Sequence, residues 1–294
     1  MEIKLIAYDS MGVRSMCTRV EADGVVLMID PSAALAPRRY GLPPHRLEWE
    51  KLNEAWRNIE EACSDADVVV VTHYHLDHYS PKRIHCYEGK VVLLKNPEEN
   101  VNFSQRRRGR FFISELKQVA KEVKYVDGAK LEFGATTVEF SPPVPHGAEG
   151  TKLGYVIMVK VAESSGDTVV FTSDVSGPVY EPATRWIINA KPRLVILDGP
   201  PTYHEGAEES LAEAARNMLA ILRESTVEKL VLDHHALRDL RYREKLRCVF
   251  EAGEELGKVV STAAEHVGRD VSLLEASRLY LYAREGLELA SLLT

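Results

Sequence analysis

Short runs of aliphatic and β-branched residues recur along the chain, and each run ends where polar residues begin. Such runs predict buried strands, because β-branched side chains pack well on a pleated surface. The predicted strands are residues 2–8, 16–21, 25–29, 68–71, 91–94, 123–126, 130–133, 136–141, 154–161, 168–172, 194–197 and 229–232. The run at 68–71 is followed at once by a polar cluster, which we expect on the loop at the carboxyl end of its strand.

Helices are predicted where apolar residues recur at spacings of three and four. In the predicted helix 48–63, Trp49 and Trp56 share one apolar face, so both are expected in the core. Further helices are predicted at 111–122, 181–190 and 208–224, and two or three more around a short strand at 259–260. No internal linker divides the chain. We therefore expect one domain over residues 1–294, completed by the helices of about 239–294.

Composition narrows the class of protein only moderately. Of the 294 residues, 28% are charged and 45% hydrophobic, which is ordinary for a soluble globular enzyme. The net charge of -7 argues weakly against a general nucleic-acid binder. No segment reaches the roughly 20 apolar residues of a membrane helix, so no membrane partner is expected. The four cysteines lie far apart and form no C-x-x-C pair, which fits reduced thiols in the cytoplasm.

The cluster after strand 68–71 contains His73, His75, Asp77 and His78. Imidazole and carboxylate are good ligands for zinc and related divalent ions. In an extended loop His73 and His75 point the same way and can hold one ion, while Asp77 and His78 leave at another angle and can hold a second. The alternative is a surface turn that is merely rich in histidine, but burying so many unpartnered polar groups would be costly.

The pattern His73-x-His75-x-Asp77-His78 after a valine-rich strand resembles the signature loop of the metallo-β-lactamase superfamily. The chain looks nearest to archaeal-type metal-dependent hydrolases of that superfamily. The resemblance implies a four-layer αβ/βα sandwich, in which two sheets pack together and helices cover the outside. It also implies two divalent ions, Zn²⁺ first and Mn²⁺ or Fe²⁺ as alternatives. Aspartate rather than cysteine at position 77 argues against true β-lactamase activity.

The resemblance also implies where the remaining ligands lie. His146, after three stiffening prolines, matches the third ligand of the first ion. Asp174, at the end of strand 168–172, matches the bridging aspartate, because one carboxylate can touch both ions. The last ligand is a histidine at a strand end, where His234 and His235 stand side by side. Adjacent residues on an extended chain face opposite ways, so we favour His234 as ligand and leave His235 as an outer or proton-donating group.

Other residues are expected around this centre. Asp30, by resemblance, supports the histidine loop without binding metal, or simply caps a strand. Asp198 orients a ligand histidine or relays a proton, or alternatively forms a structural turn. The arginines Arg106, Arg107 and Arg108 form either a solvated basic face or an anion clamp over the site. Residues 31–46 either line the substrate cleft or form a surface excursion.

Together these ligands predict metal-assisted hydrolysis. One ion would be held by His73, His75 and His146, and the other by Asp77, His78 and His234, with Asp174 shared. Asp77 and His235 are the residues expected to act in catalysis. A hydroxide between the ions would attack a phosphodiester, nucleic acid included, or alternatively a small ester, lactone or thioester. A metal-binding scaffold without activity is the non-enzyme alternative, and a homo-oligomer is left open.

Overall fold

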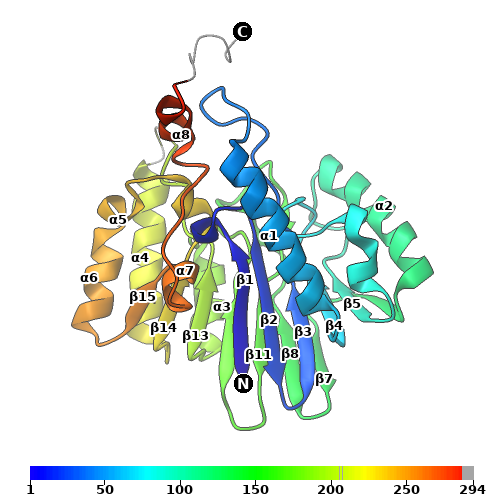
Figure 1. The fold of residues 1–294 in the computed structure, drawn as a ribbon. Coiled ribbons are helices and arrows are strands. Elements are labelled where there is room, and N and C mark those ends of the chain that lie inside the picture. The colour runs from blue at the N-terminus through cyan, green and yellow to red at the C-terminus, as the bar shows by residue number, and fades with distance from the viewer. Residues whose placement is uncertain (205, 207, 287–294) are drawn as a thin grey trace.

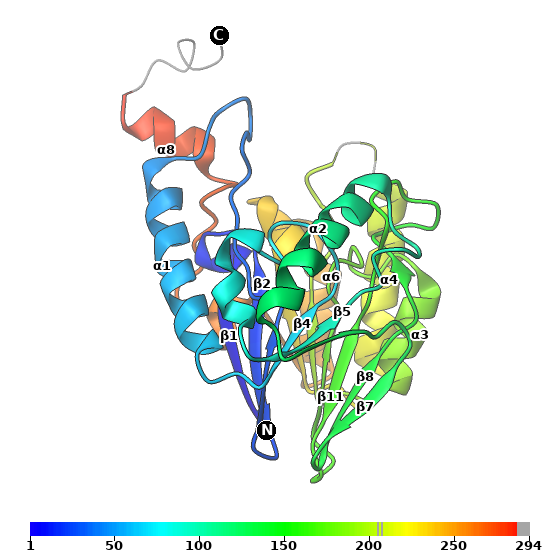
Figure 2. The same cartoon turned by 90° about the vertical axis from the view of Figure 1, so that its right-hand side faces the viewer.

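Two mixed β-sheets pack face to face, and helices cover their outer faces (Figures 1 and 2). The structure is a computed structural model and describes residues 1–204, 206 and 208–286. The first sheet has six strands in the order β1-β2-β3-β4-β5-β6, and the second has seven in the order β15-β14-β13-β12-β11-β8-β7. This layering confirms the predicted αβ/βα sandwich.

The first sheet begins with an antiparallel meander and continues with parallel strands. Its strands are β1 (Glu2–Tyr8), β2 (Met16–Ala22), β3 (Val25–Ile29), β4 (Val68–Val71), β5 (Val91–Leu94) and β6 (Glu122–Tyr125). From β3 to β6 neighbouring strands run parallel. The short helices η1 (Asp9–Met11) and η2 (Pro81–Tyr87) and the long helices α1 (Arg46–Cys63) and α2 (Phe103–Val119) belong to this half.

The second sheet mirrors this plan. Its strands are β7 (Lys130–Phe133), β8 (Thr136–Phe140), β11 (Val159–Ala162), β12 (Thr168–Phe171), β13 (Leu194–Leu197), β14 (Lys229–Leu232) and β15 (Val259–Ser261), and β9 (Val144–Pro145) pairs separately with β10 (Tyr155–Val156). From β12 to β15 the strands are parallel. The helices here are α3 (Glu181–Asn189), α4 (Glu208–Glu224), η3 (His234–Arg238), α5 (Tyr242–Lys245), α6 (Arg247–Glu255), α7 (Ala263–His266) and α8 (Arg278–Arg284).

Three apolar clusters hold these layers together. The middle cluster lies between the sheets, where Leu27 and Val70 of the first sheet meet Phe140 and Phe171 of the second. The other two clusters lie on the outer faces, one under α1 and α2 and one under α3, α4 and α6. Strands β4 and β13 are buried along their whole length, as expected of parallel strands covered on both faces. Their carboxyl ends therefore open at one edge of the sandwich.

Several sequence expectations need correction. The predicted strand 154–161 is two strands, β10 and β11, which belong to different sheets, and the described part of the C-terminal region has four helices, α5 to α8, rather than two or three. Helix α2 begins at Phe103 rather than near residue 111, because the Asn102 side chain accepts a hydrogen bond from Gln105 N (2.8 Å) and caps the helix. The arginine run thus lies on a helix. Trp49 was expected in the core but is 51% exposed, whereas Trp56 packs against the cluster under α1. The apolar face of α1 therefore starts about a turn later than its spacing suggested.

The C-terminal region is built into both halves. Strand β15 extends the second sheet beside β14, and α8 lies against the start of α1 (Figure 1). Arg278 on α8 is fully buried and pairs with Glu48 through two contacts of 2.7 and 2.8 Å. It also donates to the carbonyl oxygens of Leu42 (2.9 Å) and Ala36 (3.1 Å). The irregular segment after β3 is thereby fastened to the C-terminal region. Among the described helices, none is long and apolar enough to cross a membrane.

Candidate metal centre

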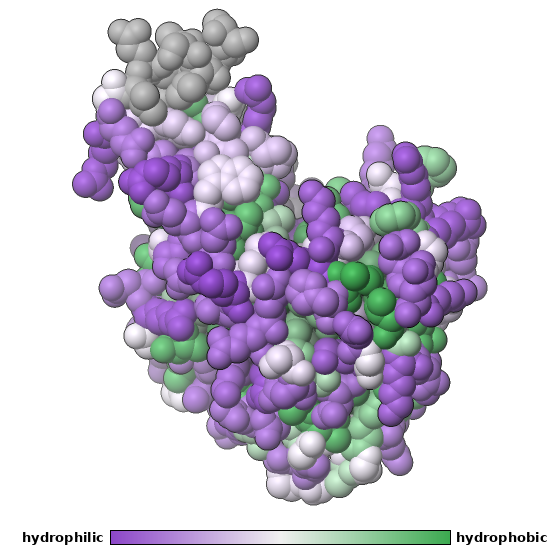
Figure 3. Space-filling view, turned by 45° about the vertical axis from the view of Figure 1, so that its right-hand side comes forward, coloured by the Kyte–Doolittle hydropathy of each residue, from purple (hydrophilic) through white to green (hydrophobic). Residues whose placement is uncertain are grey.

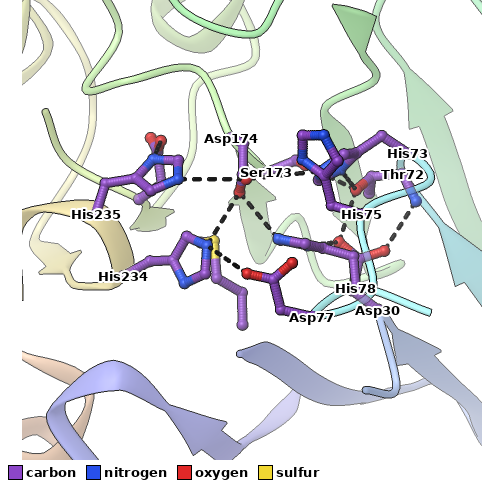
Figure 4. A network of polar contacts seen from close by, with 12 residues as sticks. Asp30, Thr72, His73, His75, Asp77, His78, Ser173, Asp174, His234 and His235 are labelled. Carbon is purple, nitrogen blue, oxygen red and sulfur yellow. Dashed lines mark hydrogen bonds and ion pairs between the residues drawn. The ribbon is translucent and has the colours of Figure 1, made fainter. Parts of the chain in front are cut away.

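Every ligand predicted from the sequence reaches one place, at the carboxyl edge of the two sheets (Figure 4). The loop after β4 supplies four of these side chains, and the loops after β9, β12 and β14 supply His146, Asp174 and His234. Four sets of side chains bring their ligand atoms within 4.8 Å of one another: His73, His75, His146 and Asp174; Asp77, His78 and His234; Asp174, His234 and His235; and Asp30, His73 and His78. The first two sets correspond to the two groupings expected from the sequence, and the third brings His235 to Asp174 and His234 as well.

The first group surrounds a position between three imidazoles. His73 Nε2 lies 3.0 Å from His75 Nδ1, and His146 Nε2 lies 3.0 Å from Asp174 Oδ2. Burial lowers the pKa of His73 well below its ordinary value and lowers that of His75 to about 4. Both rings are therefore neutral at pH 7, which is the form of imidazole that binds a divalent ion.

The second group lies on the other oxygen of Asp174. His78 Nε2 is 3.1 Å from Asp174 Oδ1, and His234 Nε2 is 3.5 Å from the same atom. Asp77 Oδ2 lies 3.7 Å from His234 Nε2. Burial alone would raise the pKa of Asp77, but His78 and His234 hold it below its ordinary value, so the side chain is a carboxylate. Asp174 therefore faces one group with each oxygen.

The extended-chain argument expected the neighbouring histidines His234 and His235 to face opposite ways, but they do not. His234 has a φ of +50° and begins the short helix η3. Both rings consequently turn towards Asp174, and each Nε2 lies 3.5 Å from one of its oxygens. His234 groups with Asp77 and His78, and it also groups with His235 and Asp174. The His235 ring lies 4.6 Å from that of His234 and 5.5 Å from that of His146.

Three buried carboxylates fix the orientation of histidine rings by accepting from Nδ1. Asp30 contacts His78 (2.7 Å) and Asp198 contacts His235 (2.8 Å), as their expected supporting roles require. Asp9 contacts His234 (2.7 Å) in the same way. A carboxylate on Nδ1 leaves Nε2 as the free lone pair and makes it more basic. Burial alone would lower the pKa of His234, but Asp9 raises it to about 9, so an ion at this position would displace a proton from Nε2.

Sequence reasoning missed Asp9 and Arg238. Asp9 directly follows β1, so the strand-end rule that found the other acids would also have found it. Arg238 carried no signal of its own in the sequence. In the structure its Nε donates to Asp9 Oδ1 (2.9 Å), and its Nη2 lies 3.0 Å from His234 Nε2 and 3.4 Å from Asp77 Oδ2.

The polar atoms of the cluster fit a group that is not part of the polypeptide. Among the described residues, His78 Nε2, His146 Nε2 and Asp174 Oδ1 are buried without any hydrogen-bond partner. Buried polar atoms normally find partners, and unpaired ones carry a large cost. Lone pairs from imidazole and carboxylate that converge in this way suit divalent cations. The donor set is therefore chemically complete for metal binding.

The arginines of the proposed anion clamp do not contact the metal-ligand candidates. Arg106 Nη2 donates to the Glu98 carbonyl (3.0 Å), and Arg110 forms two hydrogen bonds with the Glu98 carboxylate. Within the described residues, no hydrogen bond or ion pair joins Arg106, Arg107 or Arg108 to the metal-ligand candidates. Helix α2 nevertheless starts beside the site, because Gln105 Oε1 accepts from Tyr74 N (3.2 Å) in the histidine loop.

A cavity of about 140 Å³ opens beside the cluster, between the loops that follow His146, Asp174 and Asp198. Its lining is mostly apolar and includes Ala148, Val179, Pro200, Pro201 and Leu211. The surrounding surface is largely hydrophilic and is hollowed between the part that carries α8 and the part that carries α2 (Figure 3). The segment after β3 reaches this region, since Arg39 donates to the Arg238 carbonyl (2.8 Å) and its guanidinium lies 4.2 Å from the centre of the Tyr203 ring.

Comparison with known proteins agrees with this geometry. Residues 12–224 match the family model of the metallo-beta-lactamase superfamily. A UPF0282 protein of the archaeon Korarchaeum cryptofilum is 45% identical over 96% of this chain and 94% of its own length. A UPF0282 protein of Methanopyrus kandleri is 40% identical over 97% of this chain and 100% of its own length.

Solved structures resemble the chain more distantly. An isothiocyanate hydrolase from Delia radicum gut bacteria superposes with a TM-score of 0.53 at 16% identity, covering 89% of this chain and 96% of the other. Unliganded yeast PDE1 gives a TM-score of 0.52 at 12% identity, with 88% and 96% covered. At such identities the likeness concerns the fold alone. The fold, the strand-end ligands and the family match agree, and the chain belongs to the metallo-beta-lactamase superfamily, alongside the archaeal UPF0282 proteins.

Proposed function

We propose that this chain hydrolyses a small-molecule substrate with the help of two divalent ions held on either side of Asp174. Its superfamily and its His/Asp cluster make it a metal-dependent hydrolase; the number of ions and the substrate are the proposal. The observation that carries it is the convergence of buried, unpartnered ligand atoms on His78, His146 and Asp174. Zn²⁺ is the metal that these ligands suit best, and Mn²⁺ and Fe²⁺ are alternatives.

The ligand residues fall into two groups, one for each ion. His73, His75 and His146 would hold the first ion, Asp77, His78 and His234 the second, and Asp174 both. Two ions so placed would supply a water that ionises near neutral pH and positive charge for the scissile oxygen. Asp30 and Asp9 keep Nε2 of His78 and His234 aimed at the centre, so the ligands need no rearrangement during the reaction.

His235 and Asp198 form a pair suited to proton transfer. Burial lowers the pKa of His235, while burial and the nearby Asp174 raise the pKa of Asp198 well above its ordinary value. The two side chains are joined through His235 Nδ1 by a contact of 2.8 Å. We assign His235 the delivery of a proton to the leaving group, because its Nε2 faces the centre, 3.5 Å from Asp174 Oδ2, while Asp198 holds its Nδ1.

The adjacent cavity favours a compact apolar group on the substrate. A cavity of about 150 Å³ lined by apolar side chains holds a benzene ring in a well-studied case, and the one here is about 140 Å³. A small ester, lactone or thioester with a short acyl chain matches that volume. The net charge of -7 and the pairing of Arg110 with Glu98 do not favour a nucleic acid.

A small phosphodiester is the second candidate. The side-chain link between α2 and the histidine loop through Gln105 and Tyr74 supports it, because the basic run then starts close to the site. Guanidinium groups there would match a phosphate if the side chains turned from Glu98 towards the substrate.

A substrate panel separates the candidates. Metal-free protein, reconstituted with Zn²⁺, Mn²⁺ or Fe²⁺, would be assayed with p-nitrophenyl esters of increasing acyl length, homoserine lactones and bis-p-nitrophenyl phosphate. We expect metal-dependent turnover that is highest for short acyl chains. Turnover of the phosphate alone would select the second candidate, and Arg107→Ala with Arg108→Ala should then weaken it.

Two variants control the assay. Asp174→Asn should abolish turnover, because it removes the shared charge, whereas His85→Ala, a surface histidine paired with Glu60, should leave it unchanged. Metal-independent turnover, or full activity in Asp174→Asn, would refute the proposal.

A further inference from the structure

Arg238 occupies an unusual place, because it is a buried cation among groups that would bind a cation. It lies on η3 with only 5% of its surface exposed. Its Nη2 lies 3.0 Å from His234 Nε2 and 3.4 Å from Asp77 Oδ2. These are two of the ligand atoms proposed for the second ion. A guanidinium carries its charge at any physiological pH and can only donate hydrogen bonds.

Arg238 opposes an ion at the second position through its charge. Nη2 lies 3.0 Å from His234 Nε2 and 3.4 Å from His234 Nδ1, so the guanidinium lies over the face of the ring and leaves the in-plane lone pair free. Two cations on neighbouring positions repel, and burial screens the repulsion poorly. An ion at the second position therefore binds against this charge, and it competes with Nη2 for Asp77 Oδ2.

The first position has no such competitor. Among the described residues, no lysine or arginine forms a hydrogen bond or ion pair with His73, His75 or His146. Hydroxyls of Thr72 and Ser173 lie 3.2 and 3.3 Å from His73 Nδ1 instead. The two positions share Asp174. The second position differs in charge by the Asp77 carboxylate and by the Arg238 guanidinium, and only the guanidinium opposes a cation.

Asp9 holds both sides of this competition in place. Its Oδ2 contacts His234 Nδ1 at 2.7 Å and its Oδ1 accepts from Arg238 Nε at 2.9 Å. The carboxylate thus strengthens His234 as a ligand and, at the same time, keeps the guanidinium within reach of it. Asp9 offsets only part of the Arg238 charge, because the Nη2 end of the guanidinium points towards the ligands rather than towards Asp9.

We infer that Arg238 lowers the affinity of the second position, so that the two ions bind in order, first beside His146 and then beside His234. This inference rests on the two-ion centre proposed above. It assigns to Arg238 a role in setting metal loading: at limiting metal the chain holds one ion, and the guanidinium remains on Asp77 and His234.

Titration of the metal-free protein with Zn²⁺, by calorimetry and by competition with a chromophoric chelator, tests this directly. The wild type should bind two ions in steps whose dissociation constants differ at least about tenfold. Arg238→Met should leave the first constant unchanged and tighten the second by about tenfold or more. Arg238→Lys, which keeps the charge, should retain a weak second step.

Matched variants make the result decisive. Arg19→Met removes another buried arginine, which pairs with Glu21 and Asp65 away from the centre, and should change neither constant. If Arg238→Met does not fold, as judged by circular dichroism, Arg238→Gln keeps a polar partner for Asp9 without the charge and carries the same expectation. Two equal steps in the wild type, or an unchanged or weaker second step in the uncharged variant, would overturn the role of Arg238. A failure to bind two ions at all would instead overturn the proposed two-ion centre.

Discussion

At the scale of single residues, the centre depends on pairs in which a carboxylate holds a histidine. Asp30, Asp9 and Asp198 each accept from Nδ1 of a different ring. Asp30 and His234 also have positive φ values of 48° and 50°. Non-glycine residues rarely adopt this conformation, and such strain persists where the surroundings enforce it, often at functional sites. The side chains are therefore placed before any ion arrives.

His75 offers the simplest residue-level test of this arrangement. His75→Ala removes one ligand from the first group, so the purified variant should retain at least one ion fewer per chain than the wild type. Metal content after dialysis, measured by inductively coupled plasma mass spectrometry, would report the loss. His85→Ala provides the matched control and should keep the full content; equal metal in both variants would contradict the ligand role of His75.

A second residue-level prediction concerns pH and lies outside the metal site. Hydrogen bonds from Arg193 lower the pKa of Asp167, and the two side chains form two contacts of 2.7 Å. A carboxyl whose pKa is lower in the folded state contributes stability above its unfolded pKa, near about 4, and loses it as pH falls through the folded value. Asp167→Asn should therefore cost about 0.5–1 kcal/mol at pH 7 and progressively less as the pH falls below about 4.

Urea unfolding of metal-free protein at pH 7, 5 and 3 would measure this difference. The Glu122→Gln variant alters an exposed pair with Lys124 and should show a smaller, nearly pH-independent effect. A cost of Asp167→Asn that grows on acidification would show that the sign is wrong.

The residues that the sequence could and could not identify differ in one physical respect. Each predicted ligand follows a buried strand and belongs to a local sequence pattern. Such a pattern can be recognised from the sequence alone. Asp9 and Arg238 gain their roles from contacts across more than 200 residues of chain. The turn of both the His234 and His235 rings towards Asp174 likewise depends on the left-handed backbone at His234, which no spacing rule predicts.

At the scale of elements, strands were easier to predict than helix ends. Buried parallel strands such as β4, β13 and β14 have continuous apolar runs, so their limits in the sequence match those in the structure. Helix α2 was misplaced because its first turns carry mainly polar and arginine residues on their exposed side. The burial of Trp49 was predicted wrongly, because the spacing of apolar residues identifies one face of α1 but not the residue at which that face first contacts the sheet.

The link between α8 and α1 gives a prediction at this scale. Arg278 and Glu48 are both buried, and removing one partner of a buried ion pair leaves the other charge uncompensated. Arg278→Met should therefore lower the free energy of unfolding by about 3–5 kcal/mol. Urea unfolding would measure it, with the exposed Arg284→Met on the same helix expected within about 0.5 kcal/mol of the wild type. Equal stability of the two variants would contradict a structural role for the pair.

At the scale of the whole molecule, the two halves meet where their parallel strands end, and the ligands come from both. The resemblance carried by one loop was enough to predict this architecture, because the remaining ligands followed in order along the chain. The sequence could not supply the cavity beside the cluster, since its walls come from three separate loops. The preference for a substrate class therefore depends on the structure alone.

Metal binding should be visible in the stability of the whole fold. An ion that binds only the folded chain stabilises it by about 2.7 kcal/mol at a free concentration of 100 Kd. For a chain of this size that corresponds to a rise in Tm of roughly 4 °C. Differential scanning calorimetry with and without Zn²⁺ would detect it. The double variant His75→Ala, His146→Ala should show a much smaller rise, and an equal rise in that variant would place the ion elsewhere.

The most direct measurement is anomalous diffraction from crystals grown with saturating Zn²⁺, recorded on both sides of the zinc absorption edge. The account predicts two peaks about 3.5–4 Å apart, one beside His146 and the other beside His234, with Asp174 between them. The absence of a peak at these side chains, or zinc bound only at unrelated surface groups, would contradict it.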